Sequence, residues 1–398
     1  MPLKPRYDAV VIHYGEVTLK RGRRGYFERL LLRNLRRMTG VDVKRLQGRF
    51  VIDLKEDVNL DRLLDDVGRV FGVVWYAPAV KAESLDELEE KLVKILEALN
   101  PKSFKLDTRR SDKSFPMTSM EFSKILGERI SSRLGLKVDL KNPEKTIIVE
   151  ITEDGIYASH EKIQGPGGLP IGVSGRVLAL ISGGIDSPVA AWFMMRRGCI
   201  VDSLHIYNLP SIEEVMNSKI PKIVEKLVQY CFRMKLYLLP FRIFWERCEE
   251  IPEKFRLIAY RAYMFKLADI ISGKYHYLGI VSGDNLGQVA SQTLQNMFAV
   301  STFTRRPIYR PLIGFDKQET TELAKRIGTY DISVIDYPEP CEILGKYHPK
   351  TDVKVEEVQR IWMDYGLDDV VEETLKELEV YEFRSGAERP IKLESVDR

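Results

Sequence analysis

The spacing of apolar residues predicts a small α+β unit at the start of the chain. Apolar positions recur every three to four residues over 26–39, which is typical of an amphipathic helix, and Gly40 ends the pattern. The other expected elements are strands at 8–13, 50–54 and 73–80 and a helix at 60–71. This β-α-β-α-β order is typical of a ferredoxin-like fold.

A second α+β segment follows. Residues 85–99 show a clear amphipathic pattern, and 103–110 alternate as a strand that ends on basic residues. After Pro116 we expect Ser119 to cap a helix over 119–134. Strands are expected at 146–151 and 155–160.

Glycine and proline then concentrate at 164–172, which predicts a linker. Beyond it, continuous apolar strands alternate with helices, a pattern typical of a doubly wound parallel sheet. The expected elements are strands at 177–182, 200–206, 235–240 and 277–281, with helices at 188–197, 220–232 and 251–272. A helical, acidic stretch at 353–382 and a loose tail at 385–398 follow.

Composition places the chain among soluble globular proteins. It has 398 residues, 44% hydrophobic and 30% charged, and no apolar run long enough to cross a bilayer. The apolar run near the start is too short for a signal peptide, so we expect a cytoplasmic protein with no membrane segment. The cysteines Cys199, Cys231, Cys248 and Cys341 form no C-x-x-C pair, which argues against a disulfide framework, a zinc ribbon or a thiolate-held iron–sulfur cluster.

Charge is distributed unevenly. Residues 1–50 carry 13 Lys and Arg against 4 Asp and Glu, whereas residues 351–398 carry 7 against 14. A basic N-terminal third indicates a polyanionic partner, with nucleic acid first, although a solvated surface would have the same composition.

The strongest chemical signal lies at 178–189, where a strand leads through Ser182-Gly-Gly-Ile-Asp-Ser187 into a helix. Glycines 183 and 184 allow close backbone approach, and free N–H groups at a helix start favour an anion. Pro188 fits the first helical turn. The loop lacks the Gly-Lys-Ser/Thr of a Walker motif and the glycine spacing of a dinucleotide fingerprint.

The string Ser182–Ser187 resembles the signature of PP-loop pyrophosphatases, which cleave ATP to AMP and pyrophosphate. Four further stretches make the chain similar to the tRNA 4-thiouridine synthetase family: 15–20, 165–170, 282–293 and 337–341. The resemblance implies an α+β N-terminal half, ferredoxin-like at 1–60 and THUMP at 61–165. A linker at 166–172, an α/β doubly wound parallel-sheet PP-loop domain at 173–384 and a tail at 385–398 would follow.

The resemblance also implies a reaction: with ATP and Mg²⁺, the C4 oxygen of uridine 8 in tRNA is adenylated and replaced by persulfide sulfur. Asp186, Lys317 and Cys341 match the family's catalytic positions, with Cys341 as the sulfur carrier. The positions implied to contact ATP are Leu180, Ile181, Ser182, Gly183, Gly184, Asp186, Ser187, His205, Ile206, Arg261, Gly283 and Gln292. The flanking residues of Cys341 predict an exposed loop, and Cys199 and Cys231 are expected to be buried.

Two basic groups are candidates for tRNA binding. Arg29, Arg33 and Arg36 have the spacing of one helical stripe. Arg109, Arg110 and Lys113 end a predicted strand, with Phe115 nearby. Phosphate contacts from such groups would make binding strongly dependent on salt.

The sulfur source is where the chain departs from many relatives of this family. No cysteine follows Cys341, so neither a rhodanese cysteine nor a C-x-x-C pair is present. We expect a separate cysteine desulfurase or another persulfide donor to load Cys341 directly, or free sulfide to be used instead. The resemblance favours a homodimer. The alternatives are another PP-loop tRNA modifier, of the 2-thiouridylase or lysidine synthetase type, and a non-catalytic tRNA-binding protein.

Overall fold

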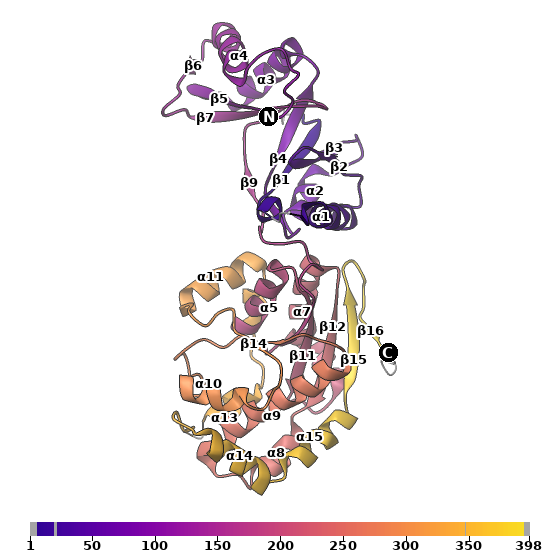
Figure 1. The fold of residues 1–398 in the computed structure, drawn as a ribbon, viewed down its shortest axis with the longest axis vertical. Helices are drawn as coiled ribbons and strands as arrows, with labels where there is room; N and C mark the ends of the chain where they lie inside the picture. The colour runs from indigo at the N-terminus through magenta and orange to yellow at the C-terminus, as the bar shows by residue number, and fades with distance from the viewer. Residues whose placement is uncertain (1–5, 20–21, 347, 394–398) are drawn as a thin grey trace. The chain divides into compact units, whose positions relative to one another are not determined.

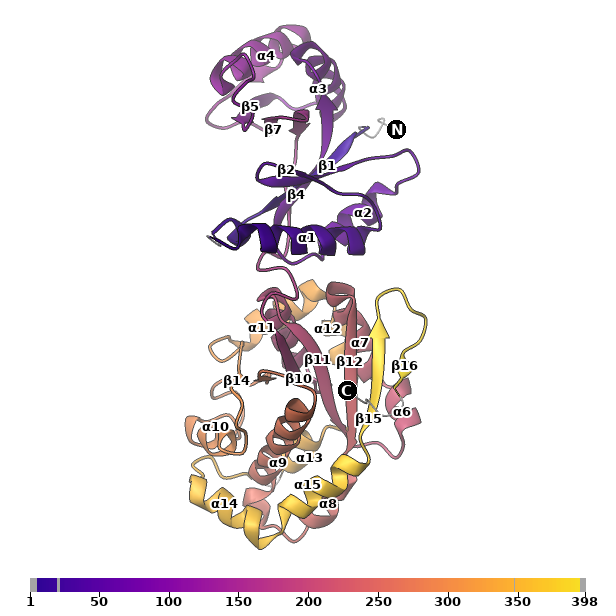
Figure 2. The same cartoon turned by 45° about the vertical axis from the view of Figure 1, so that its right-hand side comes forward.

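The computed structural model describes residues 6–19, 22–346 and 348–393. Lys20 of the 15–20 stretch and residues 394–398 of the expected tail therefore lie outside the described residues. The chain divides into two compact units, Met1–Pro170 and Ile171–Arg398. The division falls inside the glycine-rich stretch expected to be a linker. Figures 1 and 2 show the elements of each unit.

The first unit is an α+β structure built on one continuous sheet. Its elements are β1 (Ala9–Tyr14), a 3₁₀ turn (Glu16–Leu19), α1 (Arg24–Thr39), β2 (Lys44–Leu46), β3 (Arg49–Asp53), α2 (Leu60–Val67), β4 (Val73–Ala82), α3 (Leu85–Leu99), β5 (Ser103–Arg110), α4 (Ser119–Leu134), β6 (Lys137–Val138), β7 (Lys145–Thr152), β8 (Gly155–Ser159) and β9 (Ile163–Gln164). The strand order is β2-β3-β1-β4-β8-β7-β5-β6, with β9 beside β4.

Strand β4 joins the two halves of this sheet, because its first part pairs with β1 and its last residues pair with β8. One apolar core lies under α1 and α2, and a second lies under α3 and α4. Leu63 and Val67 of α2 belong to the first core, beyond the boundary at residue 60 expected from the sequence.

The predicted N-cap of α4 is wrong by one residue. Thr118, not Ser119, caps the helix: its Oγ1 accepts from the Glu121 N–H, and the Glu121 carboxylate accepts from the Thr118 N–H. This reciprocal pair satisfies two backbone donors, which a cap at Ser119 could not match because Phe122 stands at the third position after it.

The second unit is an α/β structure with helices on both sides of its sheet. Its elements are β10 (Arg176–Leu180), α5 (Asp186–Arg196), β11 (Ile200–Tyr207), α6 (Ile212–Asn217), α7 (Lys219–Cys231), β12 (Arg233–Pro240), α8 (Arg242–Cys248), α9 (Glu253–Lys274), β13 (Ile280–Val281), α10 (Leu294–Ser301), β14 (Ile308–Tyr309), α11 (Lys317–Ile327), α12 (Tyr330–Ser333), α13 (Pro340–Gly345), α14 (Val355–Asp364), α15 (Leu367–Lys376), β15 (Glu379–Arg384) and β16 (Ile391–Lys392).

The strand order is β14-β13-β10-β11-β12-β15-β16, and β14 to β12 run parallel as expected. Helices α5, α7, α11 and α12 pack together, while α9 packs with α8, α10, α13, α14 and α15 (Figures 1 and 2). Strands β10 and β11 therefore carry their carboxyl ends toward the loops in which an α/β sheet builds a site.

The expectations for the last 50 residues need correction. Helices α14 and α15 are present, but β15 is a strand that pairs antiparallel with β12, where the charge pattern predicted helix. The tail is not loose at 391–392, because β16 pairs with β15. The open edge of β12 supplies backbone partners, and Val380 and Phe383 are buried against the sheet, so tertiary pairing outweighs the local acidic pattern.

Candidate functional site

The loop after β10 folds around its own hydroxyl groups. The Ser182 N–H donates to Ser187 Oγ at 2.9 Å, and the Gly184 N–H donates to Ser182 Oγ at 3.2 Å. The two hydroxyl oxygens lie 3.2 Å apart. Helix α5 begins at Asp186, with Pro188 in its first turn. The loop therefore presents hydroxyls and a helix start at the carboxyl end of a parallel strand.

The glycines of this region are required by close approach. A β-carbon on Gly183 would collide with Lys219 Cε and lie 2.9 Å from Glu339 Oε1. A β-carbon on Gly283 would lie 2.8 Å from the Ser187 backbone nitrogen. Neither Gly183 nor Gly184 has a positive φ, so no left-handed backbone conformation requires glycine at these positions.

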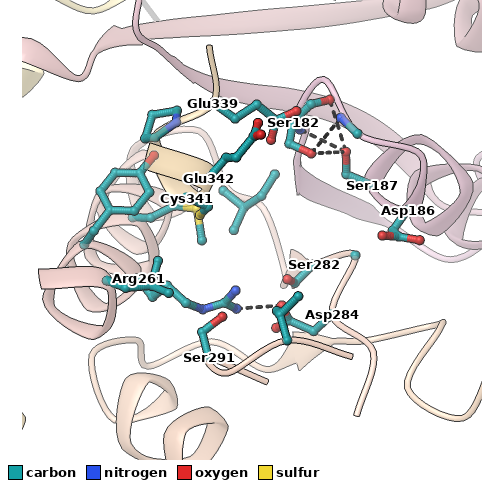
Figure 3. A pocket seen from close by; sticks show the side chains of 18 of the residues that line it. Ser182, Asp186, Ser187, Arg261, Ser282, Asp284, Ser291, Glu339, Cys341 and Glu342 are labelled. Carbon is teal, nitrogen blue, oxygen red and sulfur yellow. Dashed lines mark hydrogen bonds and ion pairs between the residues drawn. The ribbon is translucent and has the colours of Figure 1, made fainter. Parts of the chain in front are cut away.

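A cavity of about 500 Å³ opens beside the loop (Figure 3). Most of the residues implied by the family resemblance line it: Leu180, Ile181, Ser182, Gly184, Asp186, Ser187, His205, Ile206, Arg261, Gly283, Gln292 and Cys341. Gly183 and Lys317 are not among its lining residues. Sequence positions more than 150 residues apart therefore meet at one cavity, formed entirely within the second unit.

Lys317 reaches this cavity through Asp186. Its Nζ donates to both Asp186 carboxylate oxygens at 3.0 Å, and Gln288 Nε2 donates to the same carboxylate at 3.3 Å. Lys317 is the first residue of α11, whose N-cap is Asp316. The two residues matched to catalytic positions of the family therefore form one ion pair.

Arg261 is held by a buried carboxylate. It lies on α9, and its guanidinium pairs with Asp284 at 2.6 Å, while Arg310 pairs with the other oxygen at 3.1 Å. Burial acts to raise the pKa of Asp284, but the two arginines outweigh it and the pKa is lowered. Among the described residues, Arg261 Nε and Gln292 Oε1 are buried without a hydrogen-bond partner. Both atoms therefore have unused capacity for a ligand.

His205 is a neutral, fixed wall of the cavity. Its Nδ1 lies 2.8 Å from the Ile181 carbonyl oxygen, so Nδ1 carries the proton, and Nε2 accepts from the Tyr337 hydroxyl at 2.9 Å. Burial lowers the pKa of His205 to about 4.

That pKa predicts an acid-sensitive fold. The unfolded chain binds a proton at His205 near pH 6.5 and the folded chain only near pH 4, so stability present at neutral pH is lost as pH falls through this window. The loss at pH 5 should be about 2 kcal/mol. Urea unfolding at pH 7.5 and pH 5 should show it, and His205→Gln should remove that part of the pH dependence. Equal pH dependence in both proteins would contradict the assignment.

Cys341 does not lie in an exposed loop, contrary to the sequence expectation. It is the second residue of α13, partly exposed, and packs against the core around α9. Burial raises the pKa of its thiol to about 11, although the Arg261 guanidinium acts in the opposite direction. The cysteine therefore faces the cavity from a helix, and its bare thiol is protonated at neutral pH. Cys199 and Cys231 are buried, as predicted, and so is Cys248.

Two charged residues of the site were missed from the sequence. Lys219, at the start of α7, is buried, and its Nζ donates to the carbonyl oxygens of Ser333 and Ile335 at 2.9 and 2.5 Å. Burial lowers the pKa of Lys219. Glu339 lines the cavity and reaches the loop at Gly183. Glu339 stands in the stretch 337–341, but its sequence pattern assigns it no role, and Lys219 stands in no motif. Both residues reach the loop only through long-range folding of the chain.

The six candidate tRNA-binding residues have different surroundings. Arg29 and Arg33 are exposed on α1, as are Arg109 near the end of β5 and Lys113 in the turn after that strand. Arg36 instead donates to the Val43 carbonyl oxygen and pairs with Asp42 at 2.8 Å. Arg110 donates to the carbonyl oxygens of Phe115 and Met117, both at 2.8 Å. Arg36 and Arg110 therefore hold local structure, and Phe115 packs edge-on against Phe122.

Family profiles match almost the whole chain. A ferredoxin-like domain of ThiI matches residues 9–77, a THUMP domain matches 82–161, and the profile described as thiamine biosynthesis protein (ThiI) matches 172–365. Together with the Ser182–Ser187 loop at the end of β10, these matches define a PP-loop protein that carries ferredoxin-like and THUMP domains at its N-terminal side.

Its relatives specify the family. A probable tRNA sulfurtransferase of Macrococcus caseolyticus is 34% identical over 94% of this chain and 95% of its own, and one of Coxiella burnetii is 36% identical over 94% and 99%. The chain belongs to the tRNA sulfurtransferase (ThiI) family. A crystal structure of a 4-thiouridine synthetase–RNA complex with bound ATP has a TM-score of 0.86 and 31% identity, covering 95% of this chain and 100% of that one.

Among the described residues, no helix is long and apolar enough to cross a membrane, and no cluster of three His, Cys, Asp or Glu side chains could hold a metal ion.

Proposed function

We propose that this chain is an ATP-dependent sulfurtransferase that converts uridine 8 of tRNA to 4-thiouridine. The observation that carries the proposal is that Cys341 lines the same cavity as the Ser182–Ser187 loop. In this reaction the ATP at the loop activates C4 of the uridine, and the sulfur on the cysteine replaces the oxygen at the same carbon. The anion-binding loop and the sulfur carrier must therefore lie close together. The solved relative with bound RNA and ATP supports this assignment.

The cavity fits ATP. Leu180, Ile206 and Leu257 give it apolar walls for a base, and Gln292 Oε1 and Arg261 Nε are buried polar atoms without partners among the described residues. Glycines 183 and 283 leave room at the loop that a β-carbon would fill. Mg²⁺ would be held by the Asp186 carboxylate together with phosphate oxygens.

ATP, when bound, supplies the adenylyl group that makes the uridine C4 oxygen a leaving group and releases pyrophosphate. The chain's own residues provide charge and position. Hydroxyls of Ser182 and Ser187 and the start of α5 face the phosphates, and Lys317 stabilises negative charge there while Asp186 orients it. Arg261, fixed by Asp284, places a cation in the cavity, where its charge acts on Cys341.

The sulfur step uses the terminal sulfur of a Cys341 persulfide. That sulfur forms a bond to C4, the C4–O bond breaks and AMP leaves. The S–S bond that remains is cleaved by two thiols from outside, which are oxidised to a disulfide and return the Cys341 thiol. An outside thiol is needed because Cys199, Cys231 and Cys248 are buried and do not line the cavity. A cysteine desulfurase is the proposed persulfide donor. In the alternative, free sulfide would attack the adenylated C4 directly and displace AMP, without a persulfide on Cys341.

We propose that the first unit binds the tRNA. The protein would act in the cytoplasm, and it would do so as a homodimer. Exposed Arg29 and Arg33 on α1, with Arg109 near the end of β5 and Lys113 in the turn after that strand, are the proposed phosphate contacts.

Charge reversal tests this surface. Arg29→Glu with Arg33→Glu should weaken tRNA binding and reduce the slope of log affinity against log salt by about two, one for each phosphate that is no longer neutralised. Arg360→Glu with Lys376→Glu, at exposed positions on α14 and α15, is the matched control, since it makes the same charge change on the second unit. Titrations at several salt concentrations measure both. An unchanged slope in the double variant would remove α1 from the tRNA surface.

The direct test of the activity incubates the protein with unmodified tRNA, ATP, Mg²⁺, cysteine and a desulfurase. We expect the near-ultraviolet absorbance of 4-thiouridine to appear together with AMP. Mass spectrometry of the nucleosides identifies the product: 2-thiouridine or lysidine would replace this function with that of another PP-loop modifier. Binding of tRNA without pyrophosphate release would indicate a non-catalytic protein.

A further inference from the structure

The loop that would receive the phosphates already holds a carboxylate of this chain. The Glu339 carboxylate accepts from the Gly183 N–H and the Ser182 hydroxyl. Its Oε1 would lie 2.9 Å from a β-carbon on Gly183 and 3.8 Å from one on Gly184. Figure 3 shows the Glu339 side chain extending to the loop at Ser182. A carboxylate and a phosphate oxygen use the same N–H and hydroxyl donors, so both cannot occupy this position.

A buried cation stands beside this position. Lys219 Cε lies so close to Gly183 that a β-carbon there would collide with it, and the Lys219 charge acts to lower the pKa of Glu339. Burial outweighs this effect, and the pKa of Glu339 is raised. The carboxylate is therefore desolvated at the loop, and its displacement into solvent would recover its hydration.

The chain around Glu339 is anchored on one side and connected to the sulfur carrier on the other. Lys219 holds the carbonyl oxygens of Ser333 and Ile335, and the Tyr337 hydroxyl donates to His205. Beyond Glu339, Pro340 fixes the backbone and begins α13, whose second residue is Cys341. A change at Glu339 is therefore transmitted to Cys341 through one rigid residue.

We propose that Glu339 occupies the pyrophosphate position of the Ser182–Ser187 loop until ATP displaces it, and that this displacement repositions Cys341 for sulfur transfer. Glu339 is thus a positioning residue. This inference rests on the proposed use of ATP at the loop. The exchange of carboxylate for phosphate beside Lys219 and Gly183 orders the reaction: the nucleotide must be in place before the sulfur carrier is delivered.

The test uses the full chain with Glu339→Gln, which keeps the side-chain size and removes the competing charge. We expect the Kd for ATP with Mg²⁺ to fall about tenfold, as measured by equilibrium dialysis. Asp336→Asn is the matched control, because it removes an exposed negative charge from the same segment near Lys219. Its Kd should be unchanged. A higher or equal Kd for Glu339→Gln would overturn the proposal, since Glu339 would then be a ligand or a bystander.

Alkylation of Cys341 provides the second readout, with Cys341→Ser identifying the modified site. In the natural chain we expect a non-hydrolysable ATP analogue to change the alkylation rate several-fold. In Glu339→Gln the rate without nucleotide should already equal the nucleotide-bound rate. An alkylation rate that ignores nucleotide in the natural chain would overturn the link to Cys341. Absence of ATP binding in the natural chain would instead contradict the proposed function itself.

Discussion

Cys341→Ser should abolish formation of 4-thiouridine while leaving activation of the tRNA in place. The hydroxyl of serine occupies nearly the same volume but cannot carry a persulfide sulfur. The hydrogen bonds within the loop and within the Asp186–Lys317 pair connect these residues to one another and do not involve residue 341, so we expect their geometry to be kept. Thiolation should therefore fall below detection, at least about 10³-fold, while tRNA-dependent release of AMP and pyrophosphate continues.

The measurement separates the two half-reactions in one sample. Radiolabelled ATP reports AMP and pyrophosphate, and the near-ultraviolet absorbance of the tRNA reports thiolation, with a cysteine desulfurase as donor. Cys231→Ser is the control, because Cys231 is buried at the end of α7 and does not line the cavity. Normal thiolation by Cys341→Ser would end the carrier role. Thiolation of the variant with free sulfide, but not with the desulfurase, would show that Cys341 is needed only to accept sulfur from the desulfurase.

Local pattern was enough to predict the elements that position the site. Strand 177–182, a turn of glycines and a helix start at Pro188 became β10, the loop and α5, because buried parallel strands and tight turns are encoded in short stretches. The helices α1, α3 and α4 lie where apolar spacing places them. Strand β15 was not predictable in this way, since its partner β12 lies more than 130 residues earlier.

The site residues also divide into those that a local pattern predicts and those that depend on long-range contacts. The loop residues and Gly283 carry signals in their spacing, and the family resemblance supplied His205, Arg261, Gln292, Lys317 and Cys341. Lys219 and Glu339 meet the loop only because α7 and the segment before α13 fold back to Gly183. Asp284, which fixes Arg261, appears in the sequence as one residue among many carboxylates. Long-range contacts decided these roles, and no local pattern contains them.

Arg36 and Arg110 illustrate a limit on charge as a predictor. Their spacing indicates a basic surface, yet both guanidinium groups bond to backbone carbonyl oxygens of their own domain. An arginine has five donors and satisfies helix ends and loops as readily as phosphates. Charge composition therefore indicates a basic surface, and the structure shows which of its arginines are engaged in local contacts.

Asp186→Ala should remove both half-reactions. The carboxylate fixes Lys317 Nζ through two contacts of 3.0 Å and is the one carboxylate of the Ser182–Ser187 loop. Without it the lysine loses its orientation, and the Mg²⁺ proposed to bind with the phosphates would lose its protein ligand. Loss of one preorganised electrostatic group costs about 10²–10³-fold in rate, and here two depend on one residue. We expect tRNA-dependent pyrophosphate release and thiolation to fall together by about 10³-fold or more.

The pairing can be tested by a double-mutant cycle. Lys317→Ala should lower the rate of pyrophosphate release by a similar factor, and the double variant Asp186→Ala with Lys317→Ala should be little worse than either single change, because the ion pair acts as a unit. Asp331→Ala, at an exposed position on α12, removes the same charge away from the cavity and should leave the rate unchanged. Additive losses in the double variant would show that Asp186 and Lys317 act independently, with Asp186 serving the metal rather than the lysine. Thiolation that survived while pyrophosphate release was lost would separate sulfur transfer from ATP use altogether.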